Sequence, residues 1–155
     1  MDERRIGYCR ELARTVLRQH GIRRPPVDVL AMAEAEGIQV AEADLGSVEG
    51  RAYRADGAWV IEVNSRRARV AQRFTIGHEI GHIKLGHDSC GEDPVQERQA
   101  NVFGAELLMP LALLKRALKT IQALGELATL FQVSREAMRI KLDEQRLLLR
   151  LTSFD

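Results

Sequence analysis

The sequence HEIGH at residues 78–82 constrains the fold of this chain more than any other feature. It lies within residues 68–85, a stretch without proline that is predicted to be helical. Two positions four apart lie on the same helical face, one turn from each other. The imidazoles of His78 and His82 can therefore bind one metal ion together. Glu79 lies about 100° away around the helix, where it can act as a base toward a water molecule activated by the metal.

The same helix carries a separate apolar stripe. Ile76, Ile80 and Ile83 lie broadly opposite the histidines, so the histidines do not interrupt the apolar face. Gly77 and Gly81 each cost the helix roughly 1 kcal/mol relative to alanine, which is explained if another backbone packs closely here. The alternative is a buried helix with two hydrogen-bonded histidines and no metal.

A catalytic zinc takes three protein ligands and keeps one position for water. The residues that follow the helix and could supply the third ligand are His87, Asp88, Cys90, Glu92, Asp93, Glu97 and Glu106. The third histidine of the metzincin pattern is absent, because Asp88 stands at its position. If the helix continued to His87, that side chain would lie near the isoleucine stripe and face away from His78.

Asp93 followed by Pro94 is typical of a helix N-cap and first position, and predicts a second helix to about residue 109. One face of this helix holds mostly small residues, namely Glu97, Ala100, Asn101, Gly104 and Leu108. Such a face suits close packing against the glycines of the first helix. We therefore predict Glu97 as the third ligand and Asn101 as a supporting partner. The alternative is that Glu97 is an ordinary solvated carboxylate.

The formal net charge of +1 conceals an uneven distribution. Residues 1–77 carry +2, residues 78–110 carry −4 and residues 111–155 carry +3. The acidic segment also holds three of the four histidines, so the groups that bind divalent cations are concentrated there. The near-neutral total excludes a polybasic nucleic-acid tail.

No feature of the sequence indicates membrane insertion or secretion. The apolar runs are only a few residues long, and the first 20 residues lack the apolar core of a signal peptide. Two cysteines, Cys9 and Cys90, are too few for a disulfide framework. We expect a globular cytoplasmic protein, with Cys90 retained as an alternative metal ligand or redox-sensitive thiol.

The remaining segments predict an α+β fold. Further elements are expected as helices at residues 4–20 and 27–36 and strands at residues 38–40, 48–54 and 58–63. Asp56-Gly57 suits a tight hairpin turn between the last two strands. Residues 124–142 are similar to a helix-turn-helix, with Ser134 capping its second helix. DNA binding by this basic tail is conceivable, but we favour a helical packing module, because its apolar residues need burial.

Two paired motifs resemble the ImmA/IrrE family of zinc metallopeptidases. They are RFTIGHEIGHIKLGH at residues 73–87 and ERQANVFGAELLMP at residues 97–110. The upstream run PVDVLAMAEAEGIQV and a hairpin ending in VIEVN extend the resemblance over most of residues 5–110. Gly77 and Gly104 depart from the family pattern, where alanine would be expected.

The resemblance implies a gluzincin-like site in which His78, His82 and Glu97 bind Zn2+ and Glu79 is the catalytic base. The metal used in the cell is left open. The oxyanion stabiliser is also open, and its nominal candidates, each of which also has a structural interpretation, are Tyr53, Arg73 and His87.

The fold expected from these features is α+β and mainly helical. Residues 1–110 would form a zincin-like metallopeptidase domain with a small antiparallel β-sheet. Residues 111–155 would form a helical, helix-turn-helix-like subdomain packed on it. An edge strand of the hairpin could pair with an extended substrate.

The implied function is that of a zinc-dependent endopeptidase with a protein substrate. The resemblance implies a helix-turn-helix transcriptional repressor, whose cleavage derepresses stress or mobile-element genes, and neither membrane attachment nor direct nucleic-acid binding is expected. The alternative is a non-enzymatic regulator or toxin–antitoxin component whose helical tail binds DNA or a partner. Its structural metal would be held by His78, His82, His87 and Cys90.

Overall fold

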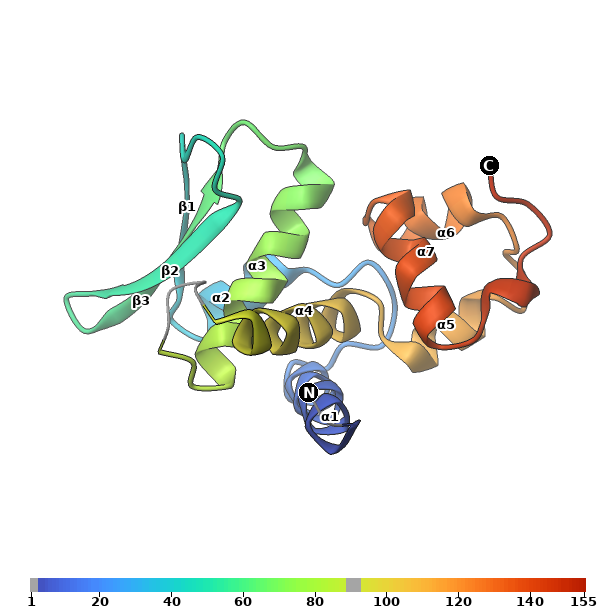
Figure 1. The fold of residues 1–155 in the computed structure, drawn as a ribbon, viewed down its shortest axis with the longest axis horizontal. Helices are drawn as coiled ribbons and strands as arrows, with labels where there is room; N and C mark the ends of the chain where they lie inside the picture. Colours follow the sequence, from blue (N-terminus) through green and yellow to red (C-terminus); the bar gives the residue numbers. More distant parts are fainter. Residues whose placement is uncertain (1–2, 89–92) are drawn as a thin grey trace.

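The computed structural model describes residues 3–88 and 93–155. Its elements in chain order are α1 (Glu3–Gln19), α2 (Val29–Ala35), β1 (Gln39–Ala43), β2 (Gly50–Ala55), β3 (Ala58–Asn64), α3 (Arg69–Lys84), α4 (Pro94–Leu108), α5 (Leu111–Ala117), α6 (Leu124–Phe131), α7 (Arg135–Glu144) and the 3-10 helix η1 (Leu148–Arg150). Figure 1 shows the sheet on one side of α3 and helices α5–α7 on the other, while α4 packs between α3 and α1. The predicted α+β, mainly helical class is confirmed. None of the helices in the described ranges is long and apolar enough to cross a bilayer.

The sheet has the strand order β1-β3-β2 and is mixed rather than wholly antiparallel. Strands β2 and β3 form the predicted antiparallel hairpin, whose turn residues Asp56 and Gly57 have φ values of 51° and 79°. Positive φ at both positions matches the twist of a two-residue hairpin. Strand β1 pairs with β3 in parallel, because the loop after β1 and the hairpin turn each reverse the chain. The most apolar strand, β3, therefore takes the centre, and β2 is left at an edge.

Helices α3 and α4 pack with their backbones close together. A Cβ atom on Gly104 would lie only 3.0 Å from the backbone nitrogen of His78, and one on Gly81 would lie 3.2 Å from the carbonyl oxygen of Ala100. The helix α4 begins as predicted, since the side chain of Asp93 accepts a hydrogen bond from the backbone of Val95 at 2.8 Å. The small residues on both helices thus bring the two predicted groups of ligands side by side.

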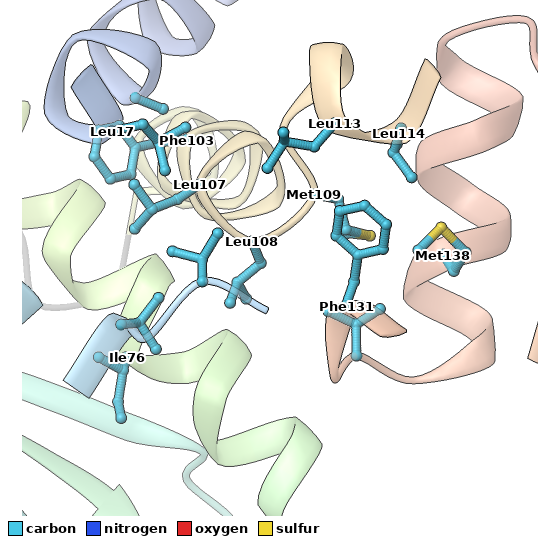
Figure 2. Packing of buried hydrophobic residues seen from close by; sticks show 14 of the residues in the cluster. Leu17, Ile76, Phe103, Leu107, Leu108, Met109, Leu113, Leu114, Phe131 and Met138 are labelled. Carbon is cyan, nitrogen blue, oxygen red and sulfur yellow. The ribbon is translucent and has the colours of Figure 1, made fainter. Parts of the chain in front are cut away.

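One hydrophobic core runs from the N-terminal helices to the C-terminal ones. Figure 2 shows Leu108 of α4 within this core, together with Leu114 of α5, Phe131 of α6 and Met138 of α7. Each of these four side chains is fully buried. Helix α5 begins directly after Pro110, within the segment 111–155 that is predicted to be helical. The division into domains at residue 110 stays a prediction.

Helices α6 and α7 form the predicted helix-turn-helix-like unit. Gln132 turns the chain in the left-handed conformation, with φ at 53°, and the Ser134 hydroxyl caps α7 by accepting from the backbone of Ala137. Arg73 of α3 donates to the backbone oxygens of Gln132 at 3.0 Å and Phe131 at 3.3 Å. The Arg73 side chain therefore holds the turn between α6 and α7 against α3 and stabilises the fold.

Candidate metal centre

Three side chains from α3 and α4 converge on one point. The Nε2 atoms of His78 and His82 lie 3.0 Å apart, and the carboxylate of Glu97 lies 2.8 Å from His82 Nε2 and 2.9 Å from His78 Nε2. In a tetrahedral zinc site with bonds of roughly 2.0–2.1 Å, neighbouring ligand atoms lie roughly 3.3 Å apart. The observed separations are a few tenths of an ångström shorter. Glu97 contacts His82 through Oε1 and His78 through Oε2. Two imidazole nitrogens and a carboxylate are a donor set that fits zinc, and they come from the three residues predicted from the sequence.

Glu79 lies beside these three groups and is nearly inaccessible to solvent, with 7% of its surface exposed. One ligand atom each from Glu79, His78 and His82 lie within 4.8 Å of one another. The Glu97 oxygens lie 2.8 and 2.9 Å from the two histidine nitrogens, so Glu97 fits the role of ligand and the buried Glu79 beside it that of base. Burial, and secondarily the Glu97 charge, raise the pKa of Glu79 from 4.5 to about 7. A carboxylate with a pKa near neutrality is suited to general acid–base chemistry.

Each histidine has a hydrogen-bond partner on its second ring nitrogen. His78 Nδ1 lies 2.7 Å from the side-chain oxygen of Asn101, to which an Nδ1 proton donates, so Nε2 is left to bind a metal. His82 Nδ1 lies 2.9 Å from His87 Nδ1. Burial, followed by the neighbouring His78, lowers the pKa of His82 and favours its neutral form. Neutral imidazole is the form that binds a metal.

His87 lies next to the site because α3 ends before reaching it. Gly86 adopts a left-handed φ of 69°, its backbone nitrogen donates to Ile83 oxygen, and His87 nitrogen donates to His82 oxygen. This pair of bonds is the Schellman arrangement that ends many helices at glycine. The turn brings His87 back to His82, whereas a continued helix would have carried it toward the isoleucine stripe. Gly86 is the residue in the sequence that could have signalled this turn.

The other candidate ligands lie apart from the convergence point or outside the described part of the chain. Asp93 caps α4, and Glu106 is buried against Lys141. Asp88 lines the cleft between α3, α4 and β2. Cys90 and Glu92 fall outside the described residues, so the alternative that uses Cys90 is untested.

The site opens into a cleft of about 1330 Å³ between α3, α4 and β2. Tyr53, Trp59 and Phe74 give its walls aromatic surface, and the edge strand β2 forms one side. Strand β2 comes close to α3 at Gly50, where a Cβ atom would overlap the methyl group of Thr75. Of the three nominal oxyanion candidates, Tyr53 and His87 line the cleft, and Arg73 is not among its lining residues.

Residues 33–143 match the family described as the IrrE N-terminal-like domain, Peptidase M78. A curated relative, the radiation response metalloprotease IrrE of Deinococcus radiodurans, is 38% identical over 102 residues, which is 56% of this chain and 31% of the relative. A solved structure titled Mycobacterium tuberculosis transcriptional regulator superposes with a TM-score of 0.68 at 19% identity, over 88% of this chain and 46% of that one. At that identity the likeness shows the fold alone.

The chain thus spans about a third of the curated relative and about half of the solved structure. The family match takes in both helices of the candidate centre, α3 and α4, and extends into α7. The chain therefore belongs to the IrrE N-terminal-like domain family, Peptidase M78.

Proposed function

We propose that this chain is a zinc-dependent endopeptidase that cleaves a protein substrate. The observation that carries the proposal is the convergence of His78, His82 and Glu97 beside a buried Glu79, on the wall of an open cleft. Membership in a family named for peptidases supports the same function. The specific metal, the cleavage reaction and the substrate are parts of the proposal.

In this proposal, His78, His82 and Glu97 hold the cation. A bound divalent cation supplies Lewis-acid chemistry, since it makes a water molecule more acidic and polarises a carbonyl group. Glu79 accepts the proton of the attacking water and passes it to the leaving amine as the peptide bond breaks. In the metal-free protein, burial raises the pKa of Glu79 to about 7, so this carboxylate is a stronger base than an exposed glutamate.

The edge strand β2 is the surface that we expect to hold the substrate. An edge strand presents unpaired backbone groups, and an extended peptide can pair with them as an added strand. The arrangement places β2 along the cleft that contains the candidate metal centre. The preferred substrate is therefore a segment that is extended when bound. Tyr53 lines the same cleft, and its phenolic hydroxyl is a candidate for stabilising the oxyanion.

We propose a helix-turn-helix repressor as the substrate, cleaved in the cytoplasm so that stress or mobile-element genes are derepressed. The name of the relative from Deinococcus radiodurans, a radiation response metalloprotease, supports a link to stress. A linker between the DNA-binding part of a repressor and its remainder would provide an extended segment for the cleft. The repressor encoded nearest to this chain is the first substrate to test.

The direct test incubates the zinc-loaded protein with that repressor and follows its cleavage on gels and by mass spectrometry. The native protein is expected to produce two defined fragments. Glu79→Gln is expected to bind zinc normally and to leave the repressor intact, because only the base is lost. Glu136→Gln, a change on the exposed face of α7, serves as the matched control and should cleave normally. Cleavage by Glu79→Gln at the native rate would contradict the proposal.

The second candidate function is a non-enzymatic regulator whose helical tail binds DNA or a partner. The helix-turn-helix-like form of α6 and α7 favours it. The surface of α7 does not favour nucleic acid, because Lys141 is buried and the accessible Arg135 and Arg139 are offset by exposed Glu136, Asp143 and Glu144. An unchanged biological effect of Glu79→Gln would support this candidate over the peptidase.

A further inference from the structure

A chain of hydrogen bonds runs from the candidate metal centre into α4. His82 Nδ1 lies 2.9 Å from His87 Nδ1, and His87 Nε2 lies 2.8 Å from the side-chain oxygen of Gln99. Gln99 is buried, with 6% of its surface exposed, and His87 is half-buried. The hydrogen-bonded series thus ends at the buried side-chain amide of Gln99, which lies two residues after Glu97 on α4.

The side-chain oxygen of Gln99, at the end of this series, determines which ring nitrogen donates in each hydrogen bond. The amide oxygen of Gln99 can only accept, so the proton of neutral His87 lies on Nε2. His87 Nδ1 is then an acceptor, and the hydrogen bond with His82 requires the proton of His82 to lie on Nδ1. The Nε2 lone pair of His82 is consequently directed toward His78 and Glu97, where it can bind a metal.

We propose that His87 and Gln99 are positioning residues that hold His82 in its metal-binding tautomer. This inference rests on the proposed metal site and adds two residues to it. The reverse direction would be incompatible with metal binding, because a donor from Gln99 would leave the proton of His82 on Nε2. We call the hydrogen-bonded series from Gln99 through His87 to His82 the relay. His78 needs no such relay, since the oxygen of Asn101 accepts from its Nδ1 directly.

The turn after α3 makes this arrangement rigid. The bond from His87 nitrogen to His82 oxygen, 3.0 Å long, joins the backbones of the same two residues whose rings are hydrogen-bonded. Gly86 permits the turn through its positive φ. His87 is therefore held from the backbone side by the turn and from the ring side by Gln99.

The test measures Zn2+ affinity by competition with a chromophoric chelator of known affinity. We expect His87→Ala to bind Zn2+ about 10–100-fold more weakly than the native protein, the usual effect of losing the partner of a ligating histidine. His87→Asn should recover most of this loss, because its side-chain oxygen takes the position of Nδ1 and accepts from His82. Gln99→Met, similar in length but without an acceptor, should weaken binding by less than His87→Ala.

His20→Ala is the histidine control, since His20 pairs with Glu36 and does not line the cleft of the candidate centre, and it should bind Zn2+ as the native protein does. Native affinity in His87→Ala, or equal losses in His87→Ala and His87→Asn, would overturn the inference. Thermal unfolding of the zinc-free variants checks their folding. If His87→Ala does not fold, Gln99→Met decides, because the proposal requires it to bind Zn2+ more weakly than the native protein, and native affinity would overturn it.

Nitrogen NMR of the zinc-free native protein supplies a second readout. The relay predicts a proton on Nε2 of His87 and on Nδ1 of His82, and the opposite pair of tautomers would overturn it. These outcomes are separable from the proposed function. Cleavage with unchanged affinity in His87→Ala rejects the relay alone, whereas the predicted losses of affinity without any cleavage by the native protein reject the peptidase alone.

Discussion

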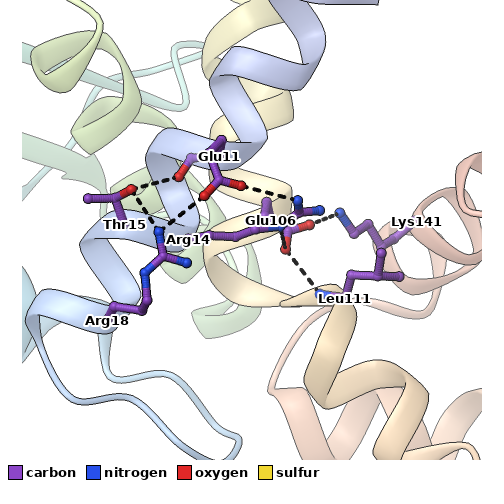
Figure 3. Close-up of polar contacts among 7 residues, drawn as sticks. All are labelled: Glu11, Arg14, Thr15, Arg18, Glu106, Leu111 and Lys141. Carbon is purple, nitrogen blue, oxygen red and sulfur yellow. Dashed lines mark hydrogen bonds and ion pairs between the residues drawn. The ribbon is translucent and has the colours of Figure 1, made fainter.

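Glu106 of α4 and Lys141 of α7 form an ion pair in which both side chains are 1% exposed and the two charged atoms lie 2.6 Å apart. The second carboxylate oxygen of Glu106 accepts from Arg14 of α1 at 3.2 Å and from the backbone of Leu111 at 3.0 Å. Figure 3 shows these partners meeting at Glu106 from three different parts of the chain. Burial lowers the pKa of Lys141, and the nearby Glu106 charge opposes that shift. The network ties the C-terminal helices to the helix that carries Glu97.

Replacing only one partner of the Glu106–Lys141 pair is expected to lower the free energy of unfolding. Lys141→Met leaves Glu106 buried with only Arg14 to balance its charge, and we expect a loss of about 3 kcal/mol in the free energy of unfolding. The double variant Glu106→Gln with Lys141→Met should be more stable than Lys141→Met alone, since no buried charge remains. Urea denaturation measures both. The exposed Glu136→Gln is the control and should leave stability unchanged, whereas a native-like Lys141→Met would show that the pair contributes nothing.

Two glycines at the α3–α4 contact should respond in opposite ways to alanine. A Cβ on Gly77 would have its nearest neighbours at 3.5–3.6 Å, an ordinary contact, so Gly77→Ala is expected to stabilise the protein by up to about 1 kcal/mol through helix propensity. A Cβ on Gly104 would lie 3.0 Å from His78 nitrogen and 3.1 Å from Gly77 carbon. Gly104→Ala must therefore separate the helices, at a cost of about 1–3 kcal/mol, and should weaken Zn2+ binding. Thermal unfolding that ranks the two variants in the reverse order would contradict the packing described.

Gly50 sets how closely the edge strand approaches the metal centre. Gly50→Ala would place a methyl group against Thr75, one turn before His78, and push β2 away from α3. We expect kcat/KM for the repressor to fall about 10–100-fold with Zn2+ affinity unchanged, because a displacement near 1 Å has effects of this size. Adding Thr75→Ser, which lacks the interfering methyl, should restore part of the activity. Native kinetics in Gly50→Ala would show that the position of β2 does not govern cleavage.

The raised pKa of Glu79 predicts a pH-dependent cost of folding in the zinc-free protein. With a pKa of about 7 when folded and 4.5 when unfolded, Glu79 is protonated in both states below pH 4.5 and charged in both above pH 7. Its charge therefore destabilises the folded state progressively between these limits, by about 3 kcal/mol in full. Glu79→Gln should accordingly match the native protein near pH 4.5 and exceed its stability above pH 7. Urea denaturation in the presence of a chelator tests this, and a difference that does not change with pH would contradict it.

The parts of the fold that local patterns determine could be predicted from the sequence. The four-residue spacing of the histidines placed them on one helical face, Asp93-Pro94 marked the start of α4, and Asp56-Gly57 marked the hairpin turn. Each of these signals acts through a few neighbouring residues. The meeting of Glu97 with the histidines was also foreseen, because small residues on both helices indicated close packing.

The parts that depend on distant contacts could not be predicted. The parallel pairing of β1 with β3 follows from which strand takes the centre of the sheet, and no local pattern sets that. The sequence makes Arg73 a candidate for stabilising the oxyanion, yet its side chain donates to the backbone oxygen of Gln132, 59 residues away. The role of His87 depends both on the turn at Gly86 and on Gln99 from another helix. The sequence showed the glycine, but only the fold brings the glutamine to the ring.

The central claim is that His78, His82 and Glu97 together bind a divalent metal. The most direct measurement is anomalous X-ray diffraction at the zinc edge from crystals of the native protein grown with Zn2+. We expect one strong peak at roughly 2.0–2.2 Å from the Nε2 atoms of both histidines and from the Glu97 carboxylate. The absence of a peak there, or a zinc bound by His87 or Cys90 in place of Glu97, would contradict it.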